Sequence, residues 1–390
     1  MKPHEMNTER EVWYRSKTFK RFRRNPLAVV GTLLLLAFIL VALFAPALTA
    51  NQLASIRSAR PCLRDLGIKR TEVMSRLRNP LDPIFWKATF APPKSCYNIP
   101  RDGFSPLPKP PTLKQPLRLQ WRLVFQTKVH VPLGSYSFDI PIKFWVPKFS
   151  WIAENWPPSA GKHPMGVSGD SYDIMYGLVW GSRTAFYVGF LVVGISLAIG
   201  IVIGGLSGFL GGAVDNLIMR VTDVMLSFPG LVFVMIVAVI FGNGLLQVML
   251  ALALIRWAGY ARFFRGDILR TKSLDFVDAA RALGGSPLRI FVKHVFPNAI
   301  GTLLIIASMD IGAIVLTAAG LSFLGLGAPV GYADWGQMIS FARGYILGTA
   351  QGTPFDFWYV WIYPTIMLVL FGLAWNLLGD AVRDALDPKS

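Results

Sequence analysis

The chain has 390 residues, of which 53% are hydrophobic and 16% charged, and its mean hydropathy is +0.47. Several apolar segments exceed the roughly 20 residues that cross a bilayer, which excludes an ordinary water-soluble domain and predicts an all-α polytopic membrane protein. The formal net charge of +17 is concentrated beside the apolar runs, as expected for charges that orient a membrane protein, so nucleic-acid binding is not expected.

Residues 1–25 carry eight Lys or Arg against three acids, and residues 26–50 form the first predicted transmembrane helix. The excess of positive charge predicts that residues 1–25 remain in the cytoplasm and that this helix leads outward. Its apolar run, Leu27 to Leu48, is too long for a signal-peptide core, so we expect it to stay as an anchor.

Residues 51–180 contain no apolar run able to span and are rich in Pro and aromatic residues, which predicts a large extracytoplasmic insertion. Alternating stretches from Trp121 to Val131 and from Ser135 to Trp145 favour strands, so a β-rich cap is one interpretation. Its 18 basic residues against 8 acidic ones fit either an acidic partner or a solvated surface.

The two cysteines of the chain, Cys62 and Cys96, both lie in this insertion. In an oxidising compartment they would form a disulfide, whereas two free thiols are the alternative. So few cysteines do not indicate a thiol metal site.

Five further transmembrane helices are predicted within residues 181–380, and residues 381–390 form a cytoplasmic tail. In the uncharged run from Thr184 to Val214, four glycines recur at every fourth position and share one helix face: Gly200, Gly204, Gly208 and Gly212. Small residues there predict close packing of another helix, with a kinked helix as the alternative.

The next uncharged run, Val224 to Ile255, holds the third and fourth helices, because Phe241-Gly242-Asn243-Gly244 supplies a turn between them. Gly301 to Leu324 forms the fifth and Trp358 to Leu378 the sixth. Charges inside a membrane normally face a partner or a water-filled path, so Asp310 in the fifth helix is a candidate pathway residue. Arg256 is expected to reach the cytoplasmic boundary.

A polar, basic loop, residues 262–298, separates the fourth and fifth helices. Ser273 is predicted to cap a short helix that ends at Gly284-Gly285, with Phe276, Ala279, Ala280 and Leu283 along one side. Ser286-Pro287 then begins a second helix, and Pro297 marks a break before the fifth span. An amphipathic loop with Arg281, Arg289 and Lys293 toward anionic lipid is the alternative.

Asp278-Ala279-Ala280, Gly284 and Pro297 have the spacing of the EAA loop of ABC-importer permeases, which this segment resembles. Three further segments resemble the second permease subunit of dipeptide, oligopeptide and nickel importers. They are Arg24-Asn25-Pro26-Leu27-Ala28, the run Leu321 to Gly327, and the C-terminal stretch from Trp361 to Pro388. The resemblance covers roughly residues 20–50 and 160–390. Asp278 replaces the commoner glutamate, and Ala318-Ala319 stand where many relatives have Glu-Ala.

This resemblance implies the six-helix fold of a type I ABC importer permease in the bacterial cytoplasmic (inner) membrane, with both termini cytoplasmic. The loop would contain the coupling helix that docks on an ATPase, through residues Phe276, Asp278, Ala279, Ala280, Arg281, Leu283, Gly284 and Pro297. The expected partners are a second permease subunit in a heterodimer, two ATP-binding subunits, an extracytoplasmic substrate-binding protein and the lipid bilayer.

The function implied is half of the translocation pathway of an ATP-driven peptide importer. ATP and Mg would bind the partner subunits, because Gly161-Lys162 lacks the other residues of a phosphate-binding loop, and no cofactor is expected in this chain. The four scattered histidines predict no metal site, and no catalytic set is seen. The alternatives are transport of nickel or another small solute, an ion-coupled secondary transporter, or a membrane-embedded enzyme.

Overall fold

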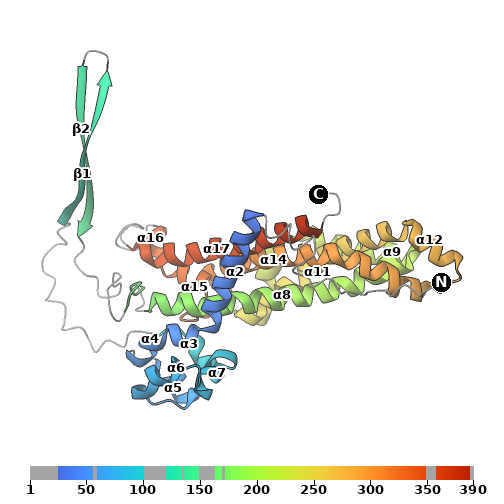
Figure 1. Cartoon of the computed structure of the whole chain (residues 1–390), viewed down its shortest axis with the longest axis horizontal. Helices are drawn as coiled ribbons and strands as arrows, with labels where there is room; N and C mark the ends of the chain where they lie inside the picture. The colour runs from blue at the N-terminus through green and yellow to red at the C-terminus, as the bar shows by residue number, and fades with distance from the viewer. Residues whose placement is uncertain are drawn as a thin grey trace, which may run out of the picture.

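The structure is a computed structural model that describes residues 25–55, 59–100, 120–133, 136–148, 163–168, 172–347 and 357–386. Long helices form an elongated bundle, with an inserted unit at one end (Figure 1). Five helical segments are long and apolar enough to cross a membrane, and one bent pair would make a sixth. The main helices are α2 (Pro26–Leu43), α8 (Ile174–Leu210), α11 (Leu245–Lys272), α14 (Phe296–Phe323) and α17 (Trp358–Leu386). The predicted all-α polytopic fold is confirmed.

The bent pair consists of α9 (Gly212–Ser227) and α10 (Gly230–Phe241), which meet at 84°. Phe228 between them is extended, with φ −76° and ψ 131°, because a residue before proline is driven out of the helical region by Pro229. The predicted third helix does end at Phe241, but it is broken. The turn at Gly242 to Gly244 leads into α11 as expected, and Gly242 has a φ of +87°.

Two predicted boundaries move. Helix α2 ends at Leu43 rather than near residue 50, and a short helix α3 (Ala45–Leu48) follows, because Pro46 has no N–H to continue the α2 hydrogen bonds. Helix α8 begins at Ile174, before the expected residue 181. Asp173 caps it, since its Oδ1 accepts a hydrogen bond from the Tyr176 N–H at 2.7 Å.

The first part of the insertion is helical, which corrects the idea of a β-rich cap. Short segments fold into a compact unit that we call the helical cap: α4 (Ala50–Ser55), α5 (Arg60–Leu66), η3 (Arg70–Glu72), α6 (Val73–Leu77), α7 (Pro83–Phe90) and η4 (Lys94–Tyr97). Strands occur among the described residues as one antiparallel hairpin, β1 (Gln120–Leu133) with β2 (Tyr136–Lys148), close to the stretches predicted from alternation.

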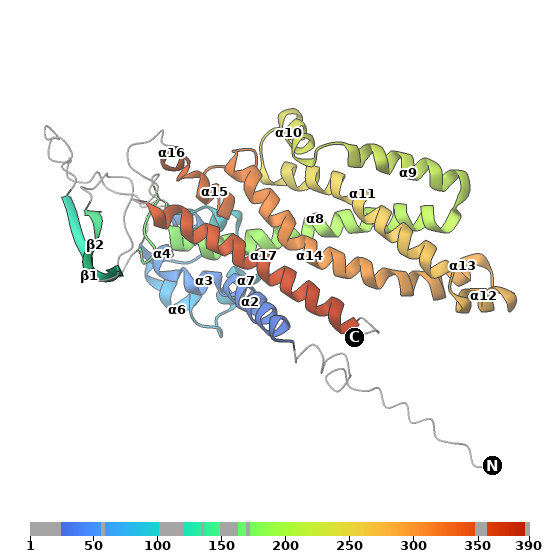
Figure 2. The same ribbon diagram turned by 90° about the horizontal axis from the view of Figure 1, so that it is seen from above.

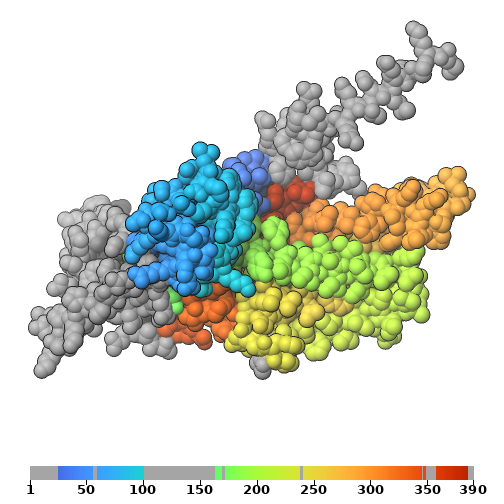
Figure 3. Space-filling model, turned by 90° about the horizontal axis from the view of Figure 1, so that it is seen from below, coloured from blue at the N-terminus to red at the C-terminus, as the bar shows by residue number. Residues whose placement is uncertain are grey.

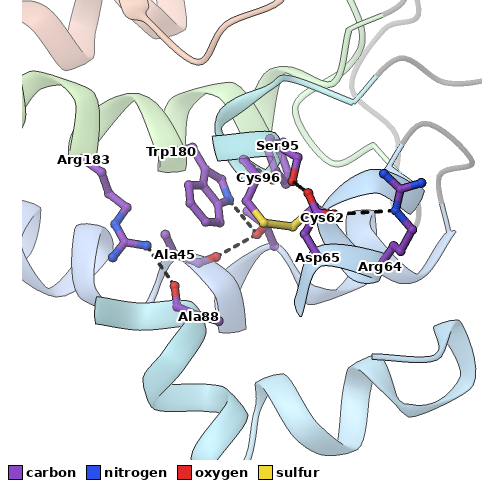
Figure 4. The surroundings of a disulfide bond; sticks show 11 residues. Ala45, Cys62, Arg64, Asp65, Ala88, Ser95, Cys96, Trp180 and Arg183 are labelled. Atoms are coloured by element: carbon purple, nitrogen blue, oxygen red, sulfur yellow. Dashed lines mark hydrogen bonds and ion pairs between the residues drawn. A yellow bond between two sulfur atoms is a disulfide. The ribbon is translucent and has the colours of Figure 1, made fainter. Parts of the chain in front are cut away.

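Cys62 and Cys96 form a disulfide inside the helical cap, with their Cα atoms 4.7 Å apart. Both cysteines are buried. The bond joins α5 to η4 and lies beside the N-terminal part of α8, where Trp180 donates a hydrogen bond to the Thr49 hydroxyl at 3.1 Å (Figure 4). Tyr176 also donates to the carbonyl of Cys96. The helical cap is therefore fixed to a helix of the bundle.

The glycine stripe of α8 lies against α11. A methyl group at Gly200 would lie 2.5 Å from Cβ of Tyr260, one at Gly208 would lie 2.8 Å from Cγ2 of Ile268, and one at Gly204 would strike the backbone of Ala261. Close approach of two backbones is what small residues permit in lipid. Gly212 is an exception: it starts α9 with a φ of +58°, and a Cβ there would meet nothing. Its assignment to the packing stripe was wrong, because α8 has already ended at Leu210.

Two short helices follow α14: α15 (Trp335–Ser340) and α16 (Arg343–Ile346). The Trp335 indole is buried and donates to the Leu178 carbonyl at 3.1 Å, so α15 inserts against α8. Helices α2 and α17 lie along one edge of the bundle, opposite α9 and α10 (Figure 2).

Candidate coupling and pathway sites

The end of the bundle farthest from the helical cap carries two short helices, α12 (Asp275–Ala282) and α13 (Pro287–Ile290) (Figure 2). We call residues 275–290 the knob. Gly284 makes the turn between the helices with a φ of +79°, a conformation that glycine adopts without steric cost. The predicted pair of short helices joined at Gly284-Gly285 is therefore present in the structure.

The knob holds some apolar side chains inward and leaves others uncovered. Val277 is fully buried and Ile290 is 6% exposed, so these residues anchor the knob to the bundle. Leu283 is 88% exposed, Leu288 62% and Phe276 41%. Exposed apolar residues gathered at one tip are typical of a surface that a partner covers.

The remaining predicted coupling residues lie on the same knob. The Arg281 guanidinium is 2.7 Å from Oδ1 of Asp278, one helical turn earlier, and both side chains are largely exposed. An exposed pair of this kind contributes little to stability. Ala279 is exposed and Ala280 half-buried, so part of the α12 backbone is open to close approach.

Two details of the predicted loop were wrong. Residues 262–272 continue α11 as helix, and Ser273 does not cap α12, because its hydroxyl donates to the Arg270 carbonyl at 2.8 Å at the end of α11. Pro297 does not break the chain, because the π-helical turn η5 (Phe291–Val295) precedes it and joins α13 to α14. The wider π-helical turn accommodates the missing N–H of Pro297, so the helix continues.

The base of the knob is joined to the C-terminal end of α8. The Lys272 ammonium donates to the carbonyls of Gly208 at 3.0 Å and Phe209 at 3.2 Å. A cation is favourable at a helix C-terminus, where the last carbonyls have no partner within the helix. The contact joins α11, from which the knob emerges, to α8.

A partly buried network lies nearby and was missed from the sequence. Arg265 of α11 makes a bidentate ion pair with Asp215 of α9, at 2.5 and 2.6 Å, and the Ser207 hydroxyl of α8 also donates to Asp215. These residues are 50 and 8 positions apart from Asp215 in sequence, so only the folded bundle brings them together.

The two charges inside the predicted spans pair with each other. Arg256 lies 3.2 Å from Oδ1 of Asp310, and the Tyr260 hydroxyl donates to Oδ2 at 2.8 Å. From the sequence, Arg256 was expected to reach the cytoplasmic boundary. In the structure it pairs instead with a carboxylate on the neighbouring helix α14. The side chain of Asp310 keeps 24% of its surface exposed and that of Arg256 38%.

A second acid, Asp334, lies after the C-terminal end of α14. Asp334 caps α15, is 8% exposed, and accepts a hydrogen bond from the Gln337 N–H at 3.3 Å. Burial raises the pKa of the Asp334 carboxyl to about 6, despite the hydrogen bond from Ser322.

Comparison with known proteins shows that the chain is similar to membrane components of transport systems. A family profile described as "Binding-protein-dependent transport system inner membrane component" matches residues 200–390, and one described as "N-terminal TM domain of oligopeptide transport permease C" matches residues 14–61. The chain is 34% identical over 295 residues to the glutathione transport system permease protein GsiD of Pectobacterium atrosepticum, covering 73% of this chain and 95% of that protein.

Two other relatives are similar over a shorter length. The probable D,D-dipeptide transport system permease protein DdpC of Escherichia coli K12 is 38% identical, covering 60% of this chain and 76% of the relative. The oligopeptide transport system permease protein OppC of Bacillus subtilis is 33% identical, covering 60% and 73%. Among solved structures, an inward-facing MetNI methionine ABC transporter matches with a TM-score of 0.44 and 21% identity, over 55% of this chain and 98% of that chain.

Proposed function

The chain belongs to the family of binding-protein-dependent transport system inner membrane components, and we propose that it is one of two dissimilar permease subunits forming the path of an ATP-driven peptide importer. It is a multi-pass membrane protein and a transporter subunit rather than an enzyme. Peptide is the proposed cargo because the relatives are named for glutathione, D,D-dipeptides and oligopeptides, all of which are peptides.

The exposed apolar tip of the knob is the single observation that carries the proposed coupling. Leu283 and Leu288 are largely exposed, although burial of each would stabilise the protein by about 2 kcal/mol. In the proposed assembly they sit in a groove of an ATP-binding subunit, and Ala279 allows that groove to approach the α12 backbone. ATP-driven closure of two such subunits then moves the knob, and α11 and α14 carry the movement into the membrane.

The translocation path is proposed to run beside α14. Asp310 and Arg256 retain partial exposure within the membrane-spanning helices, and Thr302, Ala313 and Thr317 of α14 are exposed small or weakly polar residues. A path for peptides needs such a surface, because it must pass polar backbone without binding it tightly. The second permease subunit would complete this wall, with the helical cap outside and the N- and C-termini in the cytoplasm.

Replacing Leu283 by glutamate tests the coupling. Since Leu283 is 88% exposed, the substitution should leave folding and membrane insertion intact while placing a charge in the proposed ATPase groove. We expect ATP-driven peptide uptake in proteoliposomes to fall at least tenfold. Leu81→Glu is the matched control, because Leu81 is 90% exposed but lies in the helical cap, and it should transport normally.

Normal uptake by Leu283→Glu would contradict the coupling assignment. Uptake that survives ATP depletion but stops when an ion gradient is collapsed would favour an ion-coupled transporter instead. Uptake of nickel but not of peptides would retain the coupling and change only the cargo.

A further inference from the structure

A groove runs along the outside of the bundle between α2, α8 and α17. It has a volume of about 330 Å³. Its walls are apolar and come from all three helices: Ile39, Ala42, Leu43, Phe186, Phe190 and Trp375. Each of these helices is long and apolar enough to span a membrane, so the groove opens toward lipid.

Arg183 stands at one end of the groove beside Tyr97. Its guanidinium donates to the carbonyl of Ala88 at 3.3 Å and to that of Thr89, and lies 5.2 Å from the centre of the Trp180 ring (Figure 4). Within the described ranges no carboxylate forms an ion pair with it. A half-buried cation held only by carbonyl dipoles and an aromatic face is incompletely compensated, and an anion beside it would be stabilised.

The helix that Arg183 contacts has the features of a segment at the level of lipid headgroups. Trp86 and Phe90 of α7 stack with ring centroids 5.6 Å apart and are 47% and 69% exposed. Aromatic rings with one apolar face uncovered are enriched at the membrane–water interface. In Figures 1 and 3 the helical cap overhangs the side of the bundle, and α7 is its part nearest the middle of the long helices.

A series of aromatic contacts joins the end of α2 to α7 through Phe85, which is buried. Phe44, directly after α2, lies 5.9 Å from Phe85, and Phe85 lies 5.0 Å from Trp86. This series joins a spanning helix to the exposed rings of α7, which would lie at the bilayer surface, with Arg183 at the depth of the phosphates. The acyl chains then lie at the depth of Phe186 and Phe190, further along α8 from Arg183.

We infer that this groove binds a phospholipid of the outer leaflet. One acyl chain lies along the apolar walls, and the phosphate oxygens accept charge-assisted hydrogen bonds from Arg183. A free phosphate ion would satisfy the guanidinium but leave the apolar groove unfilled. A partner protein would fill the groove but would have to bring its own anion to Arg183.

The test uses the full-length chain purified in detergent with its assembly partners, and measures retained phospholipid per chain by mass spectrometry after extensive washing. The wild type should retain about one phospholipid that bulk lipid does not replace. Arg183→Gln should retain at least fivefold less phospholipid per chain than the wild type. Arg64→Gln, at a largely exposed arginine of the helical cap, should retain as much as the wild type. Addition of inorganic phosphate should not displace the lipid, because the groove contributes to binding.

Arg183→Gln also removes contacts to α7, so a second variant leaves those contacts in place. Ile39→Trp fills the groove from α2 and should also release the lipid, whereas Leu36→Trp, at an exposed position of α2 outside the groove, should not. A photo-crosslinker at residue 39 should form lipid adducts. Equal lipid retention in wild type, Arg183→Gln and Ile39→Trp, or crosslinks only to a partner protein, would overturn the inference.

Discussion

The pairing of Asp310 with Arg256 makes a quantitative prediction about a charge inside the membrane. Arg256 lies about 16 Å along α11 from its first residue at a rise of about 1.5 Å per residue, which is close to the middle of a hydrocarbon layer of roughly 30 Å. An arginine at that depth without a counter-charge costs about 3 kcal/mol on insertion scales. In Asp310→Asn the 3.2 Å ion pair is lost and this cost is no longer offset.

The expected loss of unfolding free energy in Asp310→Asn is about 2 kcal/mol, less than the full cost because the Arg256 side chain is 38% exposed and an amide oxygen still accepts a hydrogen bond. The single variant Arg256→Gln should lose a similar amount. The double variant should lose less than the sum, by about 1 kcal/mol or more, since neither charge then remains alone.

The assay is reversible unfolding in mixed micelles, followed by tryptophan fluorescence, for the wild type, both single variants and the double variant. Tyr260→Phe is the control for the third contact, because it removes the 2.8 Å hydrogen bond to Asp310 and no charge. Additive losses, within about 0.5 kcal/mol, would show that the two charges do not stabilise each other and would refute the reasoning.

Three further predictions concern the disulfide, the contact between α8 and α11, and the acid that caps α15. Replacing Cys62 and Cys96 together by serine should destabilise the helical cap by about 4 kcal/mol, the loop-closure value for a sequence separation of 34, measured by proteolysis of the cap in intact protein. Gly204→Ala should lower the apparent Tm, because the added methyl would lie 2.9 Å from Cα of Ala261 and force α8 from α11 at a cost of about 1–3 kcal/mol. The folded-state pKa of Asp334, about 6, exceeds the ordinary value of 3.8, so folding disfavours the ionised carboxylate. The unfolding free energy of the wild type should therefore fall by up to about 3 kcal/mol as the pH rises from about 4 through 6. Asp334→Asn should remove this fall.

Each of these predictions has a distinct control. Gly194→Ala, also in α8 but with open space around a new Cβ, should not lower the Tm, and an equal effect at both glycines would refute the packing argument. Unchanged protease resistance after reduction would contradict the disulfide prediction. A pH profile that is the same for wild type and Asp334→Asn would show that another group is responsible.

The helices were the most predictable part of the fold. Uncharged runs and their charged flanks identify the bundle, and Gly242 and Gly244 mark the turn before α11, because membrane spans leave a strong local signal. The break at Pro229 was missed. A proline inside a spanning segment is often tolerated, so the residue alone does not distinguish a mild kink from an 84° bend.

The knob was predictable in outline and not in its contacts. The positions of Gly284 and Pro287 indicate two short helices, but the hydroxyl of Ser273 has two competing backbone partners, and the structure uses the one that ends α11. Pairings such as Arg256 with Asp310 depend on helix rotation and register, which no local pattern in the sequence specifies.

Helix α8 runs without interruption for 37 residues, about 55 Å at roughly 1.5 Å per residue. Trp180 and Arg183 bind its N-terminal part to the disulfide-bonded cap, while Lys272 binds its C-terminal end beside the knob. Because a continuous helix of this length is stiff, a tilt of about 10° at its C-terminal end would move the cap by about 10 Å. In the proposed orientation, a fluorophore on the cap would then report, from outside the cell, each movement that the proposed ATPase partner imposes on the knob.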